Sequence, residues 1–395
     1  MIKQIYEILR DHVLFNRERK RKTVLEERKY FSNLPKAKDA FEESFFKYKC
    51  MQWYNYPRHI RFIFNLGAFF YLPYVYVYYY AKKNVIKEKK VDLILRENPD
   101  IEFEDIIPKE VFQNRKYRIV NKYKFKNGIF NQEVKTIYGE VKKRYYFNFY
   151  FRLIILLKLT EYCGWIIKYS PKIILVYACE RDISLPLKTL LCNKMGVQHM
   201  GFMHGDLIYS IDKAYIEMNK FYVWDIHYIG LLTAVGAKKE QFVLYVPERM
   251  QNDVKLKDRP DFYATYYLSG ESKRLLENVC KIFQYFDSKG LKCSIRPHPR
   301  YSNLKLINDI FKDTNINIED AKKVSVESSM ENTENIIGLK STVLLQAYYG
   351  GRQIILDDLS DINLFNVLHD SGYILLKKEY KLLSDVINCH KKGGD

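Results

Sequence analysis

Apolar and polar positions change along the second half of the chain in a pattern that is typical of alternating strands and helices. Short runs rich in Val, Ile, Tyr and Phe predict strands, and longer amphipathic stretches between them predict helices. Because the connections are short, this alternation predicts parallel sheets covered by helices. The predicted strands are 172–178, 197–203, 221–224, 242–246, 261–268, 292–296, 316–318, 334–339 and 353–356.

A polar stretch without strand pattern at 252–260 divides these elements into two sets. We therefore predict an α/β protein of two Rossmann-type domains that face each other across a cleft, with a ligand at the carboxyl edges of the strands. The predicted domains are 1–255, which consists of a helical and irregular part (1–150) and a parallel sheet (151–255), and 256–395, which ends in a helix at 376–390.

The first 150 residues are harder to interpret. Residues 1–60 have a charged, mostly helical pattern, and 91–95 predict a short strand. The dipeptide Asn127-Gly128 predicts a hairpin between 123–126 and 129–134. The twenty residues of 62–81 carry no charge and include six tyrosines, with basic residues on both sides. Because tyrosine prefers the membrane interface, we expect a buried or interface-lying element, with a single membrane span as the less favoured alternative.

Charge and cysteine content narrow the choice of partners and compartment. A net charge of +18 favours an anionic partner such as a phosphorylated small molecule or an anionic membrane surface. The lysines are spread along the chain and no recognition motif appears, which makes nucleic-acid binding the least favoured alternative. The seven cysteines form no Cys-x-x-Cys pair, so we expect neither a zinc site nor disulfides. We therefore expect a cytoplasmic protein, which could be peripheral on the inner membrane face.

One loop stands out as a candidate phosphate site. The predicted strand 292–296 runs into Pro297-His298-Pro299-Arg300, where the two prolines end the strand and stiffen the loop. His298, with Arg296 and Arg300 on either side, would then sit at the carboxyl edge of the second sheet. The alternative is a surface turn with solvated arginines.

A second candidate lies further along the same domain. Ser341-Thr342 opens a predicted helix, and a helix N-terminus offers free N–H groups and the positive end of a dipole to a phosphate. The alternative is a plain helix cap. Ser269-Gly270 follows the first strand of this domain, where glycine would let the backbone approach a nucleotide, unless it is only a turn.

The His298-Pro299 loop, followed by the helix start Ser-Thr-Val-Leu-Leu-Gln-Ala at 341–347 and a glycine before the next strand, resembles a known family. It is similar to bacterial GT-B glycosyltransferases of surface polysaccharide synthesis, of sialyltransferase or capsule polysaccharide type and, more distantly, of CDP-glycerol polymerase type. The resemblance covers about 170–360 and is absent over 1–150. It implies that His298, Ser341 and Thr342 hold the phosphate of a CMP-activated donor.

The resemblance also implies a general base on the first domain, after the strand 197–203. The sialyltransferases carry an acidic-acidic-Gly motif there, whereas this chain has His204-Gly205-Asp206, which looks more like the capsule and CDP-glycerol enzymes. The base is therefore Asp206 or His204, and a simple turn is the alternative. On the acceptor side, Glu180, Arg181 and Asp182 follow the strand 172–178, although Asp182 could equally cap the next helix.

We therefore expect an inverting, metal-independent glycosyltransferase without a cofactor. Its substrates would be a nucleotide-sugar, best a CMP-sialic acid or similar donor, and a glycan or lipid-linked acceptor of surface polysaccharide or lipooligosaccharide synthesis. The sequence contains no Asp-x-Asp metal motif at the place where a GT-A enzyme needs one. The alternative is a CDP-polyol phosphotransferase of capsule or teichoic-type polymer synthesis. The oligomeric state stays open.

Overall fold

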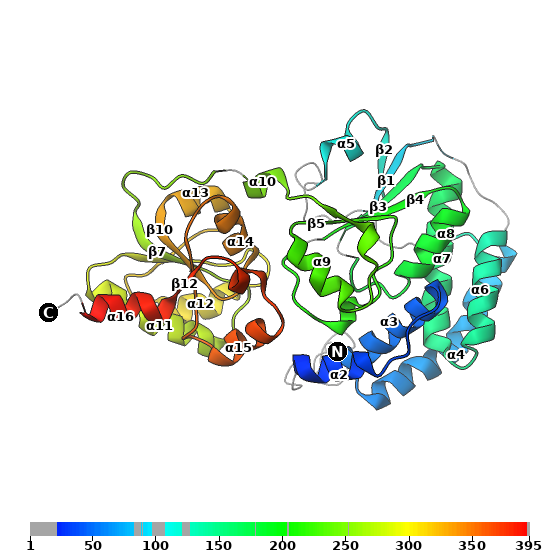
Figure 1. Cartoon of the computed structure of the whole chain (residues 1–395), viewed down its shortest axis with the longest axis horizontal. Helices are drawn as coiled ribbons and strands as arrows, with labels where there is room; N and C mark the ends of the chain where they lie inside the picture. Colours follow the sequence, from blue (N-terminus) through cyan, green and yellow to red (C-terminus); the bar gives the residue numbers. More distant parts are fainter. Residues whose placement is uncertain are drawn as a thin grey trace. The chain divides into compact units, whose positions relative to one another are not determined.

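The β-branched and aromatic runs form two parallel sheets in a computed structural model of the chain, and each sheet is the centre of its own compact unit (Figure 1). The structure describes residues 22–82, 88, 90–96, 107–120, 127–177, 179–203, 205–251 and 253–392. The first unit comprises 1–204 and 209–245, and the second comprises 205–208 and 246–395. The prediction of an α/β protein with two Rossmann-type domains is confirmed for the sheets.

The sheet of the first unit has the strand order β2-β1-β3-β4-β5-β6, and the neighbouring strands are parallel. Its central strand β3 is buried from Ile173 to Val176, which explains why this strand appears in the sequence as a continuous apolar run rather than an alternating one. The strands are β1 (Leu93–Arg96), β2 (Tyr117–Val120), β3 (Ile173–Tyr177), β4 (Gln198–Phe202), β5 (Lys220–Val223) and β6 (Phe242–Leu244).

The helices of the first unit are gathered mainly around α7, the longest buried one. α7 contacts α4, α6 and α8, and most of its side chains are buried. The helices are α2 (Val24–Ser32), α3 (Ala40–Asn55), α4 (Arg58–Ala81), α5 (Lys109–Phe112), α6 (Gln132–Arg144), α7 (Phe149–Tyr169), α8 (Leu185–Lys194) and α9 (Ile226–Thr233), with 3-10 turns η4 (Ile211–Lys213) and η5 (Lys239–Gln241).

The predicted hairpin around Asn127-Gly128 is wrong. Its first arm, 123–126, lies outside the described residues, and its second arm is a coil that leads into α6 at Gln132. Gly128 is needed for close packing instead, because a Cβ there would lie 2.6 Å from the Tyr79 ring. A Cβ on Gly164 would likewise lie 2.3 Å from the Asn127 carbonyl. The small residues therefore let this segment pass between α4 and α7.

The sheet of the second unit has the order β9-β8-β7-β10-β11-β12, again with parallel neighbours. Numbered within the unit, this is the 3-2-1-4-5-6 order of a dinucleotide-binding fold. The strands are β7 (Phe262–Tyr267), β8 (Cys293–Arg296), β9 (Asn317–Ile318), β10 (Thr333–Gly338), β11 (Ile354–Leu356) and β12 (Lys381–Leu382).

The second unit begins at Val246, earlier than the boundary at 255/256 expected from the sequence. The short helix α10 contacts α14, Met250 is buried, and the Val254 amide donates to the Gly350 carbonyl at 3.3 Å. The C-terminal helix begins only at Leu383, after a 3-10 turn and β12. The helices are α10 (Glu248–Gln251), α11 (Lys273–Ser288), α12 (Leu304–Phe311), α13 (Val326–Glu331), α14 (Thr342–Tyr349), α15 (Ile362–Asp370) and α16 (Leu383–Lys392), with the 3-10 turn η6 (Ile374–Lys377).

Candidate functional site

The second sheet reverses its strand order between β7 and β10, and the loops after these two strands meet at this switch point. β7 lies between β10 and β8, so the loops after β7, β8 and β10 leave the same edge of the sheet side by side. They carry Ser269-Gly270, His298 and Ser341-Thr342 respectively. The carboxyl edge at a switch point is the usual ligand site of such sheets. The structure thus brings together the three phosphate-site candidates of this unit.

The loop after β8 is a closed turn that fixes the His298 ring. β8 ends at Arg296, as the two prolines predicted. The His298 amide donates to the Ser302 hydroxyl at 2.8 Å, and the Ser302 amide donates to the His298 carbonyl at 3.2 Å. The His298 Nδ1 atom lies 3.1 Å from the Arg300 amide nitrogen and 3.3 Å from that of Tyr301. Both amides donate, so Nδ1 must be unprotonated.

This geometry sets the tautomer and the charge of His298. Because Nδ1 accepts hydrogen bonds, the neutral ring carries its hydrogen on Nε2. Partial burial lowers the pKa of His298, and the nearby Arg300 lowers it further. The neutral ring with an Nε2–H donor is therefore the form that prevails at neutral pH. Such a group can donate one hydrogen bond to a phosphate oxygen.

Ser341 caps α14 and still has a hydrogen to offer. Its hydroxyl oxygen accepts from the Val343 amide at 3.3 Å, and the side chain is largely buried. A hydroxyl that accepts through a lone pair keeps its own O–H, so the capping role and a phosphate-binding role are compatible. Thr342 is exposed at the first position of the helix. The positive end of the helix dipole lies at the same place.

Ser269 and Gly270 are held by a neighbour that the sequence did not single out. The Glu271 carboxylate accepts from the Ser269 amide at 2.5 Å, the Ser269 hydroxyl at 3.0 Å and the Gly270 amide at 2.8 Å. Burial raises the pKa of Glu271, and these hydrogen bonds lower it. Gly270 has a φ of +107°, and a Cβ there would lie 3.1 Å from Tyr301 Cβ. Glycine thus lets the loops after β7 and β8 touch.

The two arginines beside His298 differ in their surroundings. Arg296 is buried and donates to the Glu319 carboxylate at 2.9 Å and to the Val324 carbonyl at 2.7 Å. Arg300 is exposed, and its guanidinium lies 5.7 Å from the ring centroid of Tyr301. Arg296 therefore supports the loop from inside the unit, whereas Arg300 lies on its surface.

Glu180, Arg181 and Asp182 follow β3 at the switch point of the first sheet, between β1 and β3, but their side chains do different things. Glu180 is buried. Arg181 is 66% exposed, and its Nε atom lies 2.7 Å from the Oδ2 atom of the buried Asp212. Asp182 accepts from the Ser184 amide at 3.0 Å, ahead of α8. Only Arg181 of the three offers a largely exposed side chain.

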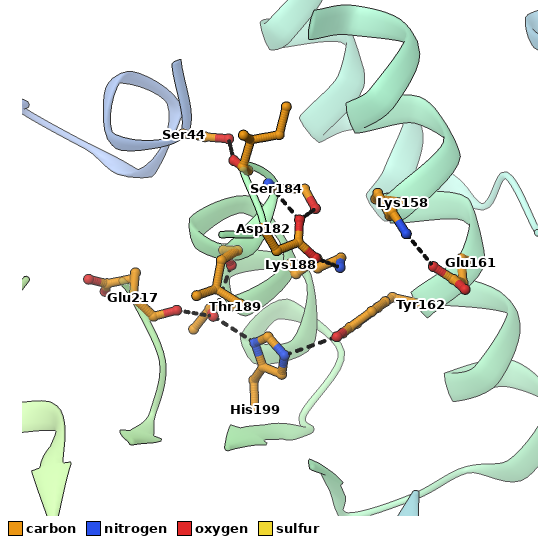
Figure 2. Close-up of polar contacts among 12 residues, drawn as sticks. Ser44, Lys158, Glu161, Tyr162, Asp182, Ser184, Lys188, Thr189, His199 and Glu217 are labelled. Carbon is orange, nitrogen blue, oxygen red and sulfur yellow. Dashed lines mark hydrogen bonds and ion pairs between the residues drawn. The ribbon is translucent and has the colours of Figure 1, made fainter. Parts of the chain in front are cut away.

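Asp182 belongs to an internal polar cluster (Figure 2). Its carboxylate is ion-paired with Lys188, which is completely buried. Burial alone would raise the pKa of Asp182, but the Lys188 ammonium holds it well below its usual range. The free-energy cost of removing two charges from water is offset only when the charges pair as closely as these do. Asp182 is therefore placed as a structural residue of the first unit.

His199 of β4 lies in the same cluster and is structural (Figure 2). The Thr189 hydroxyl donates to the Glu217 carbonyl at 2.6 Å, so its oxygen accepts from His199 Nδ1 at 2.8 Å. Nε2 then accepts from the Tyr162 hydroxyl at 3.2 Å. The ring is neutral because burial lowers the pKa of His199 to about 3.

The two candidate bases are placed unequally. His204 lies outside the described residues. Asp206 belongs with 205–208 to the second unit, although the sequence assigned this segment to the first domain. A Cβ on Gly205 would lie 3.8 Å from Thr342 Oγ1. The pKa of Tyr373 is raised mainly by its burial and further by the negative charge of the nearby Asp206 carboxylate. Asp206 is therefore close to the start of α14.

Sequence reasoning missed several polar partners of these residues. Lys47 is completely buried, and its ammonium donates to the carbonyls of Glu180 and Ala214 at 2.6 and 2.5 Å. Burial lowers the pKa of Lys47 to about 8. Glu271 could have been found from its place directly after Ser269-Gly270. Lys47 gave no such signal, because it lies in a helix 133 residues before the carbonyl that it binds.

No group of three or more His, Cys, Asp and Glu residues with metal-binding geometry occurs among the described residues. The first unit contains a cavity of about 260 Å³ between β2 and α7, with Arg118, Glu161 and Trp165 in its lining. We assign this cavity no role.

Neither a protein-family model nor a curated protein matches the chain significantly. UDP-GlcNAc 2-epimerase from Methanocaldococcus jannaschii is 14% identical, with a TM-score of 0.41 over 68% of this chain and 83% of that one. The calicheamicin glycosyltransferase CalG4 is 9% identical, with a TM-score of 0.45 over 75% of this chain and 86% of that one. The wall teichoic acid polymerase TagF is 10% identical, with a TM-score of 0.43 over 82% and 86%. Similarities as weak as these carry no argument about activity.

Proposed function

We propose that the chain is a nucleotide-sugar-dependent glycosyltransferase whose donor phosphate binds at the switch point of the second sheet. The observation that carries this proposal is that His298 and Ser341-Thr342 follow β8 and β10, on either side of the central strand β7. An Nε2–H donor, two hydroxyls and the positive end of a helix dipole can together stabilise the negative charge of a phosphate there. The resemblance of these motifs to GT-B glycosyltransferases supports the same role.

In the proposed reaction an acceptor hydroxyl attacks the anomeric carbon of the donor sugar from the face opposite the nucleotide. The bond between this carbon and the phosphate oxygen breaks as the new bond forms, so the configuration inverts. The acceptor proton passes to Asp206 or His204. The nucleotide leaves with its charge stabilised by His298, Ser341, Thr342 and the positive end of the α14 dipole. Arg300 adds a positive charge on the loop surface, and the transfer needs no metal.

The donor that we favour is CMP-sialic acid or a similar CMP-sugar, and the acceptor is a surface polysaccharide or lipooligosaccharide. This choice rests on the resemblance of the sequence to sialyltransferase and capsule enzymes. The second candidate is a CDP-polyol phosphotransferase, because the His-Gly order at 204–205 departs from the sialyltransferase motif. Both reactions use the same phosphate site and differ in the group transferred.

A nucleotide-release assay with CMP-sugars, CDP-polyols and UDP-sugars tests the proposal. We expect release from one donor class, unchanged by a metal chelator and reduced at least tenfold in His298→Ala at low donor concentration. The class that reacts decides between the glycosyltransferase and the phosphotransferase. If no donor releases nucleotide and no nucleotide shifts the melting temperature, both proposals fail. Unchanged turnover of His298→Ala would remove the phosphate site from the mechanism.

A further inference from the structure

Helix α4 buries one narrow stripe against the rest of the first unit. The buried positions recur every three to four residues or at multiples of that spacing, as expected for a single helix face that contacts α7. The packing is fixed by a polar side chain as well, because Asn65 donates to the Phe147 carbonyl at 3.0 Å and accepts from the Tyr150 amide at 3.1 Å. The buried residues are Ile60, Ala68, Leu72, Val75 and Tyr79.

The remaining surface of α4 is just as apolar but is exposed. Phe70 is 70% exposed and Phe62 is 68% exposed, and no charged residue occurs from Phe62 to Ala81. A helix that is apolar all round is normally buried all round. We call the exposed part the aromatic face. It consists of Phe62, Ile63, Leu66, Phe69, Phe70, Tyr71, Tyr74, Val77 and Tyr80, together with Tyr146 and Phe147 in the turn that precedes α7.

The chemistry of the aromatic face and its ends suits an anionic bilayer. Tyrosine side chains favour the boundary between headgroups and acyl chains, and phenylalanine is typical of the inserted apolar face of an interfacial helix. Basic residues flank the face, with Arg58 and Arg61 at one end and Lys82 at the other. No Asp or Glu occurs anywhere from 44 to 87. Positive charge around an apolar face is attracted to anionic headgroups.

A membrane span and a second copy of the chain fit less well. Among the described residues α4 is the one helix long and apolar enough to cross a bilayer. Spanning would detach it from α7, uncover its buried stripe, and place Asn65 and six tyrosines in the hydrocarbon. Two copies joined through this face would bring like basic ends together without a carboxylate between 44 and 87 to pair with them.

We infer that α4 lies flat in the headgroup region of an anionic membrane, with its aromatic face inserted and its buried stripe still packed on α7. This inference goes beyond the proposed transfer reaction and does not depend on it. It would hold the enzyme at a membrane surface, where lipid-linked molecules are available.

Co-sedimentation of the full chain with vesicles tests the inference. We expect binding to vesicles of phosphatidylcholine with phosphatidylglycerol, and weaker binding to phosphatidylcholine alone or at high salt. Phe70→Glu and Tyr74→Glu should each weaken binding roughly tenfold or more, because each removes an inserted aromatic side chain and adds a negative charge. Ile226→Glu is the matched control, because Ile226 is 69% exposed in α9 of the same unit. It should bind as the wild type does.

Four outcomes would overturn the inference. These are no binding of the wild type to anionic vesicles, equal loss in Ile226→Glu and Phe70→Glu, a dimer that Phe70→Glu dissociates without any vesicle binding, and resistance of the bound protein to alkaline carbonate, which indicates a span. Circular dichroism of each variant confirms that it is folded. Release by carbonate, together with selective loss in the α4 variants, supports an interface-lying helix.

Discussion

The guanidinium of Arg296 lies 2.9 Å from the carboxylate of Glu319, and both side chains are almost completely buried. Arg296 ends β8 and Glu319 directly follows β9, so the ion pair ties together the carboxyl ends of two neighbouring strands. Glu319 also accepts from the Ser329 hydroxyl at 2.9 Å. The pair therefore holds the end of β8, from which the His298 loop begins, inside the unit.

Removing one partner of this pair should destabilise the protein. Arg296→Met leaves the Glu319 carboxylate buried without its cation, which costs about 3–5 kcal/mol. Arg300→Met is the matched control; its guanidinium is exposed, and we expect a change below about 1 kcal/mol. Urea unfolding midpoints measure both. If Arg296→Met unfolds no earlier than Arg300→Met, the pair does not stabilise the unit.

His298 should act through its Nε2–H donor rather than through a positive charge. His298→Ala should weaken nucleotide binding by roughly 10- to 100-fold, as for a lost hydrogen bond to a charged group. His298→Gln should keep part of the affinity, because its amide N–H reaches a similar position. Isothermal titration calorimetry with the best nucleotide of the donor panel measures this.

The pH dependence distinguishes the two forms of His298. Burial and Arg300 lower the pKa of His298 below the ordinary value of 6.5, so the neutral ring is the major form as the pH falls from about 8 to 6.5. If the neutral ring binds the phosphate, the affinity ratio of wild type to His298→Gln should not rise over this range. A ratio that rises as the pH falls towards 6.5 would show that the charged imidazolium binds the phosphate.

Gly270 should be required for the shape of the site. Its φ of +107° is strained for any other residue, and a Cβ would lie 3.1 Å from Tyr301 Cβ, so Tyr301 would have to shift. Gly270→Ala should therefore displace the His298 loop and weaken nucleotide binding. Gly290→Ala is the control, because Gly290 has a φ of +75° but no atom within 4 Å of a Cβ. It should lose about 1 kcal/mol of stability and no affinity. Equal affinities of the two variants would contradict this role.

The central strands of the two sheets, such as β3 and β8, could be predicted because they are buried on both faces and therefore appear as apolar runs. The edge strand β2 could not, since Tyr117, Arg118 and Ile119 are exposed and show no burial pattern. The order of the strands was also hidden. It is the placing of β10 beside β7, rather than any local motif, that brings Ser341 next to the loops of Gly270 and His298.

Within the site, the sequence located the loops but not the partners of their side chains. It could mark Arg296 as a cation beside His298, but the residue that binds it, Glu319, follows another strand. The sequence likewise could not show that Glu271 accepts from the amides of Ser269 and Gly270, because that depends on the backbone conformation of one turn. These contacts are set by tertiary packing.

The buried His199 should make stability depend on pH. The pKa of His199 is about 3 in the folded chain, against an ordinary value of 6.5 that applies to the unfolded chain. As the pH falls, the unfolded chain therefore becomes protonated at this position before the folded chain does. Its contribution is complete above pH 6.5 and is lost as the pH falls from 6.5 towards 3, by about 1.4 kcal/mol per pH unit. The difference in unfolding free energy between wild type and His199→Gln should fall by that slope. A difference that does not change between pH 6.5 and pH 4 would contradict the assignment.

Cys389 should be the one thiol that reacts rapidly in the folded protein. All seven cysteines lie in the described part of the chain, and six of them are buried while Cys389 is exposed on α16. Burial raises the pKa of Cys50 and of Cys192 to about 12, which keeps these thiols protonated and shielded. Titration with Ellman's reagent in mildly alkaline buffer should therefore give one fast thiol, and all seven cysteines should react in guanidinium chloride. Cys389→Ser should abolish the fast phase, and a remaining fast thiol would show that a second cysteine opens to solvent in the native state.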